Sequence, residues 1–298
     1  MRLWSIVFTS LIAFGVSGPV TAQEASITCT GQSAQGGLLL CTALAGSAVL
    51  VSGQDGSRLR EVPVNADGIA TIGLHRAEAL TLSIRPKSGS APATIVSLTE
   101  RDDPFRKIEG LDCDKVDART EDQKAQAGRS WVKKQAAFKT FASGPGASQG
   151  FLRPSEGRMS SPFGPARKYI GVGKDGEPCE KTSVHYGYDI AIPIGTEIVA
   201  PADGTVTLGD PDLYYEGGTV FLDHGDGLVS VFLHMSVVDV AAGDKITAGT
   251  RLGASGNTGR TSGPHLHWAV KWRNPSAPDR GGDFYIDPAL LLDLMPAG

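Results

Sequence analysis

Short apolar runs, interrupted every few residues by glycine, proline and acidic turns, recur along most of the chain and constrain its fold more than any other feature. The 298 residues include 38 Gly and 18 Pro, which favours many short elements joined by turns. In the second half these runs include EIVAP, GTVTL, LVSVFLHM and HLHWAVKW. We therefore expect a mainly β protein whose C-terminal part is an antiparallel sheet with clefts lined by one face of its strands.

The first 22 residues are typical of a secretory signal peptide, with basic Arg2, an apolar stretch from Leu3 to Val16 and small Ala22. Cleavage is expected after Ala22. The apolar stretch is shorter than the roughly 20 residues of a transmembrane helix, and no later segment replaces it. The mature protein is therefore expected to be periplasmic or secreted and not membrane-spanning.

The remaining chain divides into three segments by composition. Residues 23–110 alternate apolar and polar residues in runs such as SAVLVSG and LTLSIRP, which predicts a small β-sandwich domain. Residues 111–150 are rich in Ala, Lys and Gln and are interpreted as a linker that contains one helix. Residues 151–298 hold the remaining strand-like runs and form the expected second domain.

The helix of the linker is expected near residues 120–142. Thr120 and Gln123 form a capping box at its start, and Gly144 is interpreted as its C-terminal cap. The apolar edge of this helix is expected to pack on a neighbouring domain. Its aromatic residues are Trp131, Phe138 and Phe141.

Four cysteines in an exported chain are most simply interpreted as two disulfides, because such bonds persist outside the cytoplasm. Four cysteines allow three connectivities. Cys29 and Cys41 share the first domain, so we pair them and leave Cys113 to pair with Cys179. No CxxC spacing occurs, which disfavours a metal site built from cysteine.

Two histidines close to the C-terminus carry the strongest chemical signal. Side chains alternate faces along a strand, so His265 and His267 of the HLH triplet point to one side. Leu266 and Trp268 then point toward a core. Two imidazoles on one strand face are costly when charged and are poor core fillers, whereas a metal ion holds an imidazole neutral.

A second pair, His185 and Asp189, lies in HYGYD, where a spacing of four places both on one face if the segment is extended. A zinc hydrolase needs three protein ligands, with a fourth position left for water. His234 ends the run LVSVFLHM, where alternation places it on the face of Ser230 and Phe232. These residues are therefore expected to line one cleft.

The two other histidines are assigned structural roles. His75 has no His, Cys or acidic partner at ligand spacing. His224 lies in LDHGDG, a turn between two expected strands, where histidines commonly bond to backbone groups.

Several ordered motifs resemble one known family. HYGYDIAIPIGTEIVAPADGTV, LDHGDGLVSVFLHMS and AAGDKITAGTRLGASGNTGRTSGPHLHWAV are similar to segments of the lysostaphin-type, or LytM-like, peptidoglycan zinc metallo-endopeptidases. The similarity covers about residues 151 to 293. It implies an enzyme with one Zn²⁺ per chain that acts on peptide cross-links or stems of peptidoglycan. In the periplasm that the signal peptide and the cysteines suit, a bond between D-Ala and a diamino acid would be the natural target.

The resemblance also implies roles for individual residues. The zinc ligands would be His185, Asp189 and His267, and the catalytic residues His265 and His234. In metal-assisted hydrolysis, zinc acidifies a water molecule and polarises the scissile carbonyl. One catalytic histidine would transfer the proton and the other would position water or stabilise the oxyanion, and the sequence does not decide which does which.

The interval GPARKYIGVGKDGEPCEKTSVHY departs from the family by extra residues before the first ligand. We therefore expect an unusual loop beside the groove. Arg260 has two interpretations: a solvated side chain, or a group that meets a substrate carboxylate.

Two alternative functions stay open. A non-catalytic regulator could bind the wall and activate another hydrolase. A structural zinc site would be four-coordinate without spare histidines, so His234 and His265 count against it.

The small net charge of −4, not concentrated in any block, disfavours nucleic acid as a partner. The first domain could shade the groove, bind glycan, or dock to a regulatory or divisome protein.

Overall fold

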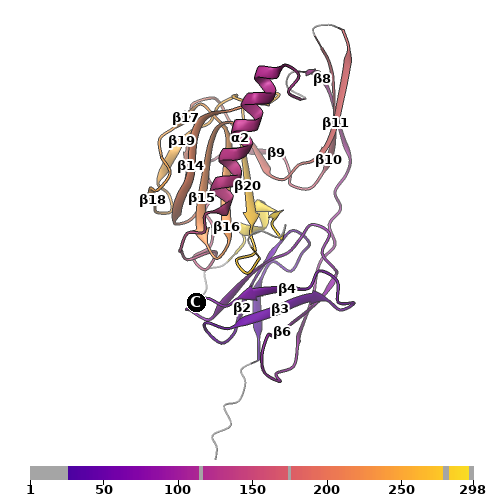
Figure 1. Ribbon diagram of the computed structural model, residues 1–298, viewed down its shortest axis with the longest axis vertical. Helices are drawn as coiled ribbons and strands as arrows, with labels where there is room; N and C mark the ends of the chain where they lie inside the picture. Colours follow the sequence, from indigo (N-terminus) through magenta and orange to yellow (C-terminus); the bar gives the residue numbers. More distant parts are fainter. Residues whose placement is uncertain (1–25, 114–116, 174–175, 278–281, 295–298) are drawn as a thin grey trace, which may run out of the picture.

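A computed structural model describes residues 26–113, 117–173, 176–277 and 282–294. The expected signal peptide lies outside these residues. No helix within the described ranges is long and apolar enough to cross a membrane. The protein is mainly β, as predicted, with one long helix, α2, lying across the C-terminal strands (Figure 1).

The N-terminal region is a small β-sandwich, as predicted, and appears in indigo and purple in Figure 1. One sheet has the order β1-β2-β5 and the other the order β4-β3-β6-β7. Alternation along two paired strands buries Val49 and Val51 of β3 and Leu82 and Ile84 of β6. The strands are β1 Thr28–Gly31, β2 Leu38–Thr42, β3 Ala48–Gly53, β4 Arg60–Pro63, β5 Ile69–Gly73, β6 Thr81–Pro86 and β7 Thr94–Ser97.

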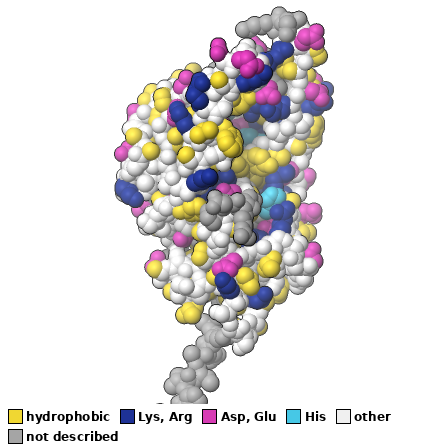
Figure 2. Space-filling model, in the orientation of Figure 1, with side chains coloured by type: hydrophobic (Ala, Val, Ile, Leu, Met, Phe, Trp, Pro, Cys, Tyr) yellow, Lys and Arg dark blue, Asp and Glu magenta, His cyan; other side chains and the backbone are white. Residues whose placement is uncertain are grey.

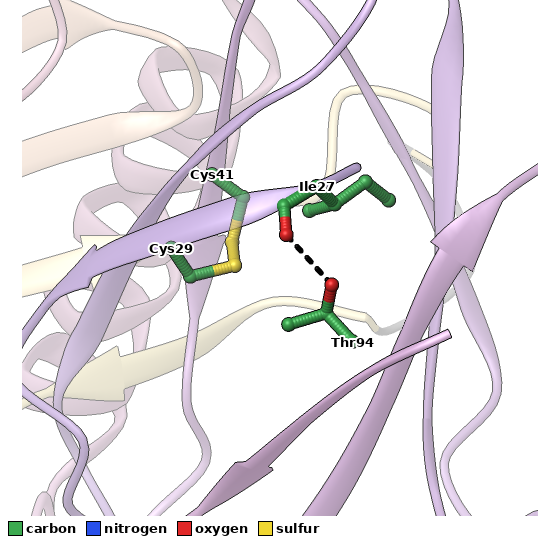
Figure 3. The surroundings of a disulfide bond; sticks show 4 residues. All are labelled: Ile27, Cys29, Cys41 and Thr94. Carbon is green, nitrogen blue, oxygen red and sulfur yellow. Dashed lines mark hydrogen bonds between the residues drawn. A yellow bond between two sulfur atoms is a disulfide. The ribbon is translucent and has the colours of Figure 1, made fainter. Parts of the chain in front are cut away.

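One predicted disulfide fastens an edge of this sandwich. Cys29 and Cys41 occupy directly paired positions of β1 and β2, and their sulfur atoms are bonded. Beside them, the Thr94 hydroxyl of β7 donates to the Ile27 carbonyl at 2.7 Å (Figure 3). The edges of the two sheets are therefore joined near the disulfide.

The C-terminal region is built on an antiparallel sheet of order β18-β14-β15-β16-β20-β12-β9, with β21 paired to β20. A smaller sheet of order β13-β19-β17 packs beside it. Leu266, Trp268 and Phe232 are fully buried, as alternation along β20 predicts for the first two. The strands are β9 Arg158–Ser161, β12 Tyr188–Ala191, β13 Glu197–Val199, β14 Gly204–Leu213, β15 Gly217–Gly225, β16 Leu228–Met235, β17 Val237–Val238, β18 Lys245–Ile246, β19 Arg251–Ala254, β20 Leu266–Trp272 and β21 Phe284–Ile286.

Helix α2 spans Glu121–Lys139 and begins with the predicted capping box between Thr120 and Gln123. It ends earlier than expected, because Thr140 is extended and acts as the C-cap. Gly144 has another role: a side chain there would collide with the His224 carbonyl. The short helix α3 spans Pro288–Leu291.

Only part of the aromatic edge of α2 packs as expected. Phe138 is buried against Phe221, with ring centres 4.6 Å apart. Trp131 is instead 59% exposed. The helix packs on the sheet through Phe138 and is held by the buried guanidinium of Arg273, which donates to the carbonyls of Phe138 and Thr140.

The interval expected to be an unusual loop is a β-hairpin that belongs to a three-stranded arm (Figure 1). The arm comprises β8 Arg106–Asp112, β10 Ala166–Val172 and β11 Pro178–Val184, and β8 runs parallel to β10. The second predicted disulfide joins Cys179 of β11 to Cys113, which directly follows β8. Strand β8 crosses residue 110, where the sequence suggested a domain boundary.

The sandwich packs against one end of the large sheet. The Trp272 indole of β20 donates to the Thr71 carbonyl at 3.0 Å, and its ring lies where a side chain at Gly73 would stand. At the β15–β16 turn, Asp226 accepts hydrogen bonds from Asn65 and Thr71. The hydrophobic core is continuous between the two regions.

Candidate active site

Strand pairing and a chain bend bring three potential metal ligands together. Asp189 of β12 and His267 of β20 are directly paired, and Asp189 Oδ1 lies 2.8 Å from His267 Nδ1. His185 follows β11 and precedes β12, so it reaches Asp189 by a bend of the chain rather than by a shared strand face. His185 Nε2 is 3.0 Å from Asp189 Oδ1 and 3.1 Å from His267 Nδ1.

The donor set of this cluster fits a cation. His185 Nδ1 lies 2.7 Å from the Pro162 carbonyl and must donate its proton there. In the neutral imidazole Nε2 then carries only a lone pair, which faces a carboxylate oxygen. Burial lowers the pKa of His185 and keeps that form. A metal ion among the three atoms would remove the repulsion between these lone pairs.

The aspartate is ionised and oriented for such a role. Burial alone would raise the pKa of Asp189, but the contacts with His185 and His267 hold it well below its usual value. Its second oxygen, Oδ2, accepts from Arg167 at 3.2 Å, and Arg167 also donates to Ser161. Arg167 therefore turns Oδ1 toward the two imidazoles.

Gly187, between His185 and Asp189, makes room for the third group. A β-carbon at this position would collide with Nε2 and Cε1 of His267. The absence of a side chain lets the imidazole turn Nδ1 toward Asp189.

Two further imidazoles face the same place. His265 Nδ1 lies 2.8 Å from the Gly263 carbonyl, and His234 Nδ1 lies 2.9 Å from the Thr258 carbonyl. In both rings the proton is therefore held at Nδ1, and Nε2 is the atom available in the cleft. The ring centres are 4.8 Å apart, and His265 Nε2 is 3.8 Å from Asp189 Oδ1. Burial, followed by the neighbouring His265 and His267, lowers the pKa of His234 to about 3.

His234 reaches the cleft by a different route from the one that alternation suggests. The face of Ser230 and Phe232 is the core face, because both residues are fully buried and Ser230 bonds to Trp268. The opposite face of β16 carries Leu233, which is paired with His267. His234 has a φ of 65°, a left-handed conformation that takes it out of the strand alternation. This local backbone change carries its ring to the cleft.

The five side chains line a cleft of about 260 Å³. The lining also includes Ile108 and Tyr169 of the arm, together with Tyr215 and Arg260. Figure 2 shows this face of the molecule, with hydrophobic and basic side chains gathered around the hollow beside the arm. The Arg260 guanidinium lies 4.9 Å from the Tyr215 ring centre, so it belongs to the cleft wall rather than to open solvent.

The remaining histidines lie apart from the cleft. His224 is fully buried, with Nδ1 2.8 Å from the Asp203 carbonyl and Nε2 2.8 Å from the Ser230 hydroxyl. His75 Nδ1 accepts from the backbone N–H of Ala77. Neither lines the cleft, which agrees with the structural roles expected for them.

Residues 183–279 match the family described as Peptidase family M23. The three converging potential ligands and the two additional imidazoles all fall within this stretch. The chain contains an M23 peptidase domain.

Relatives of the M23 domain include two cell-wall enzymes of Vibrio cholerae. The peptidoglycan DD-endopeptidase ShyA is 38% identical over 126 residues, which is 42% of this chain and 27% of ShyA. The peptidoglycan DD-endopeptidase ShyC is 32% identical over 111 residues, or 37% of this chain and 24% of ShyC. The chain thus spans about a quarter of the length of these relatives.

A solved structure resembles this chain beyond the M23 domain. It is a crystal structure of a putative peptidase M23 from Pseudomonas aeruginosa, 27% identical, with a TM-score of 0.57. The alignment covers 90% of this chain and 97% of that one. The similarity in fold therefore extends to the N-terminal sandwich.

Sequence reasoning found the four histidines and the aspartate that line the cleft and missed several other lining residues. Arg167 and Tyr169 lie in the interval before the first ligand, and only its extra length drew attention to it. Tyr215 and Glu216 also line the cleft, and the Lys134 ammonium of α2 pairs with Glu216. No motif in the sequence connects these residues with the histidines.

Proposed function

We propose that this protein is an exported zinc endopeptidase that hydrolyses peptide bonds in the cross-links or stems of peptidoglycan. One observation carries the proposal. His185, Asp189 and His267 converge on a common point, and two more imidazoles with available Nε2 atoms face the same cleft. Three protein ligands beside imidazoles that do not bind the metal are typical of a catalytic rather than a structural zinc site.

The three converging residues would hold the metal through His185 Nε2, Asp189 Oδ1 and His267 Nδ1. Bound zinc supplies Lewis acidity, which polarises a carbonyl and acidifies water. His265 would accept the proton at Nε2 and pass it to the leaving amine, because it lies beside the ligands and its Nδ1 is anchored. His234 carries its proton at Nδ1, so its Nε2 would accept a hydrogen bond from the attacking water and orient it.

The substrate and the compartment follow from different observations. Relatives named peptidoglycan DD-endopeptidases support a bond between D-Ala and a diamino acid as the target. Two disulfides suit an oxidising compartment, which supports a periplasmic or secreted protein. The full set of five site residues favours catalysis over the alternative role of a non-catalytic regulator.

The proposal is tested with residues 23–298 incubated with purified cross-linked peptidoglycan. We expect release of soluble muropeptides, loss of release after metal chelation and recovery with zinc. His265→Ala should retain stoichiometric zinc and lose turnover. Undiminished release by the chelated protein or by His265→Ala would contradict the enzyme assignment.

A further inference from the structure

We propose that the N-terminal sandwich positions the metal ligand His185, through two arginines that hold the segment of residues 162–165. This inference rests on the proposed metal site. The sandwich supplies no side chain to the cleft lining, so among the described residues it does not shade the groove. Its effect on the site would instead pass through the backbone that orients one ligand.

The inner side of the 162–165 segment is bonded to His185 by three hydrogen bonds. The Pro162 carbonyl accepts from His185 Nδ1 at 2.7 Å. The Pro165 carbonyl accepts from the His185 N–H at 3.0 Å, and the Gly164 N–H donates to the His185 carbonyl at 2.8 Å. Both the backbone position of His185 and the direction of its ring therefore depend on this short segment.

The outer side of the same segment is bonded to the sandwich. Arg101 Nη2 donates to the Phe163 carbonyl at 2.9 Å, and Arg76 Nη2 donates to the Gly164 carbonyl at 2.8 Å. The Arg101 guanidinium also lies 5.0 Å from the centre of the Phe163 ring, which is almost fully buried. The carbonyls of Pro162 and Pro165 thus face the proposed ligand His185, and those of Phe163 and Gly164 face the sandwich.

The two arginines are themselves fixed. Both pair with Asp103, at 3.2 Å for Arg101 and 2.8 Å for Arg76, and Arg101 also pairs with Asp287 at the start of α3. Asp103 lies so close to Gly164 that a β-carbon there would collide with its carboxylate. Gly164 has a φ of 113°, which only glycine adopts readily. The segment is therefore held in one conformation by the sandwich.

Loss of the Arg101 contact would release the Phe163 carbonyl and loosen Pro162 beside it. The partners that orient a ligand histidine typically contribute 10–100-fold to metal affinity. Arg101 acts one step further out, so we expect a smaller effect, about three- to tenfold.

The experiment compares zinc affinities of full-length mature variants by competition with a chromophoric chelator, well below their unfolding midpoints. Arg101→Gln should bind zinc about three- to tenfold more weakly than wild type. Thr71→Val is the matched control, because it removes a sandwich-to-sheet hydrogen bond, to Asp226, that does not touch the 162–165 segment. Its zinc affinity should equal that of wild type.

Arg76→Gln provides a second variant, in case Arg101→Gln does not fold. It removes the donor to Gly164 from a less buried side chain, and its affinity should fall in the same direction by less. Wild-type affinity in the folded arginine variants, or an equal fall in Thr71→Val, would overturn the inference while leaving the proposed function intact. Failure of the wild-type chain to bind zinc would overturn the proposed function as well.

Discussion

The two ends of the β15–β16 hairpin each carry buried histidine, and they use it differently. At one end His224 donates from Nδ1 to the Asp203 carbonyl and accepts at Nε2 from the Ser230 hydroxyl. At the other end His234 anchors only Nδ1 and keeps Nε2 for the cleft that it shares with His265 and His267. Burial lowers the pKa at both ends. The number of partners on each ring, rather than its burial, therefore separates a structural histidine from one able to do chemistry.

Removal of a cleft histidine should have the largest effect on metal binding and activity. We expect His267→Ala to lose stoichiometric zinc and all muropeptide release, because it deletes one of three converging ligands. Metal content of the purified variant measures this, beside His265→Ala as the variant that should keep the metal. Zinc bound at wild-type affinity by His267→Ala would show that the proposed set of ligands is wrong.

Removal of the structural histidine should have the opposite profile. His224→Leu leaves the Asp203 carbonyl without its donor and Ser230 with no acceptor for its hydroxyl proton, so the free energy of unfolding should fall by about 2–4 kcal/mol. Zinc affinity should be unchanged. Chemical denaturation and zinc titration of the same preparation measure the stability and the zinc affinity. Weaker zinc binding under native conditions would contradict a purely structural role for His224.

The pH dependence of stability sharpens the comparison further. Burial lowers the pKa of His224 to about 4 from 6.5, so the unfolded chain binds more protons between these values, and stability falls as pH decreases from 6.5 to 4. His224 alone accounts for about 3 kcal/mol of this loss at pH 4. Denaturation midpoints of chelated wild type and His224→Leu across this range measure it as the difference between the two proteins. A difference independent of pH would mean that His224 takes up its proton at the same pH in the folded and the unfolded chain.

The last of these comparisons concerns Arg167, which donates to the proposed ligand Asp189. Arg167→Met leaves Asp189 Oδ2 without this donor, and zinc affinity should weaken about tenfold. Lys168→Met is the control, because Lys168 is the adjacent cation and pairs with Glu180 on the arm. Equal affinities in the two variants would show that the orientation of Asp189 does not depend on Arg167.

Local patterns predicted much of this fold. The sandwich, the antiparallel sheet and the start of α2 depend on alternation, turn residues and the Thr120 capping box, all of which act over a few residues. The disulfide pairs also agree with the structure, because Cys29 and Cys41 lie in neighbouring strands. The parallel pairing of β8 with β10 was not predicted, since it joins strands about 60 residues apart by contacts that no local pattern encodes.

The site divides in the same way. His265 and His267 follow from strand periodicity, and the five proposed residues do meet in one cleft. His234 was placed by the wrong argument, because a single left-handed residue overrides alternation. Arg167 and Tyr169 come from the arm, and Arg101 acts from the sandwich. Their proximity to the ligands exists only after distant segments have packed.

Gly187 has a consequence for recognising related sites in other chains. The space that it leaves is occupied by the ring of His267, so a spacing rule of histidine, three residues and aspartate omits one necessary condition. A chain with all three ligands but with alanine or a larger residue at this position would carry the metal-binding groups without the room to bring them together. A pattern that also requires glycine two residues before the aspartate would distinguish such chains from those that can assemble the site.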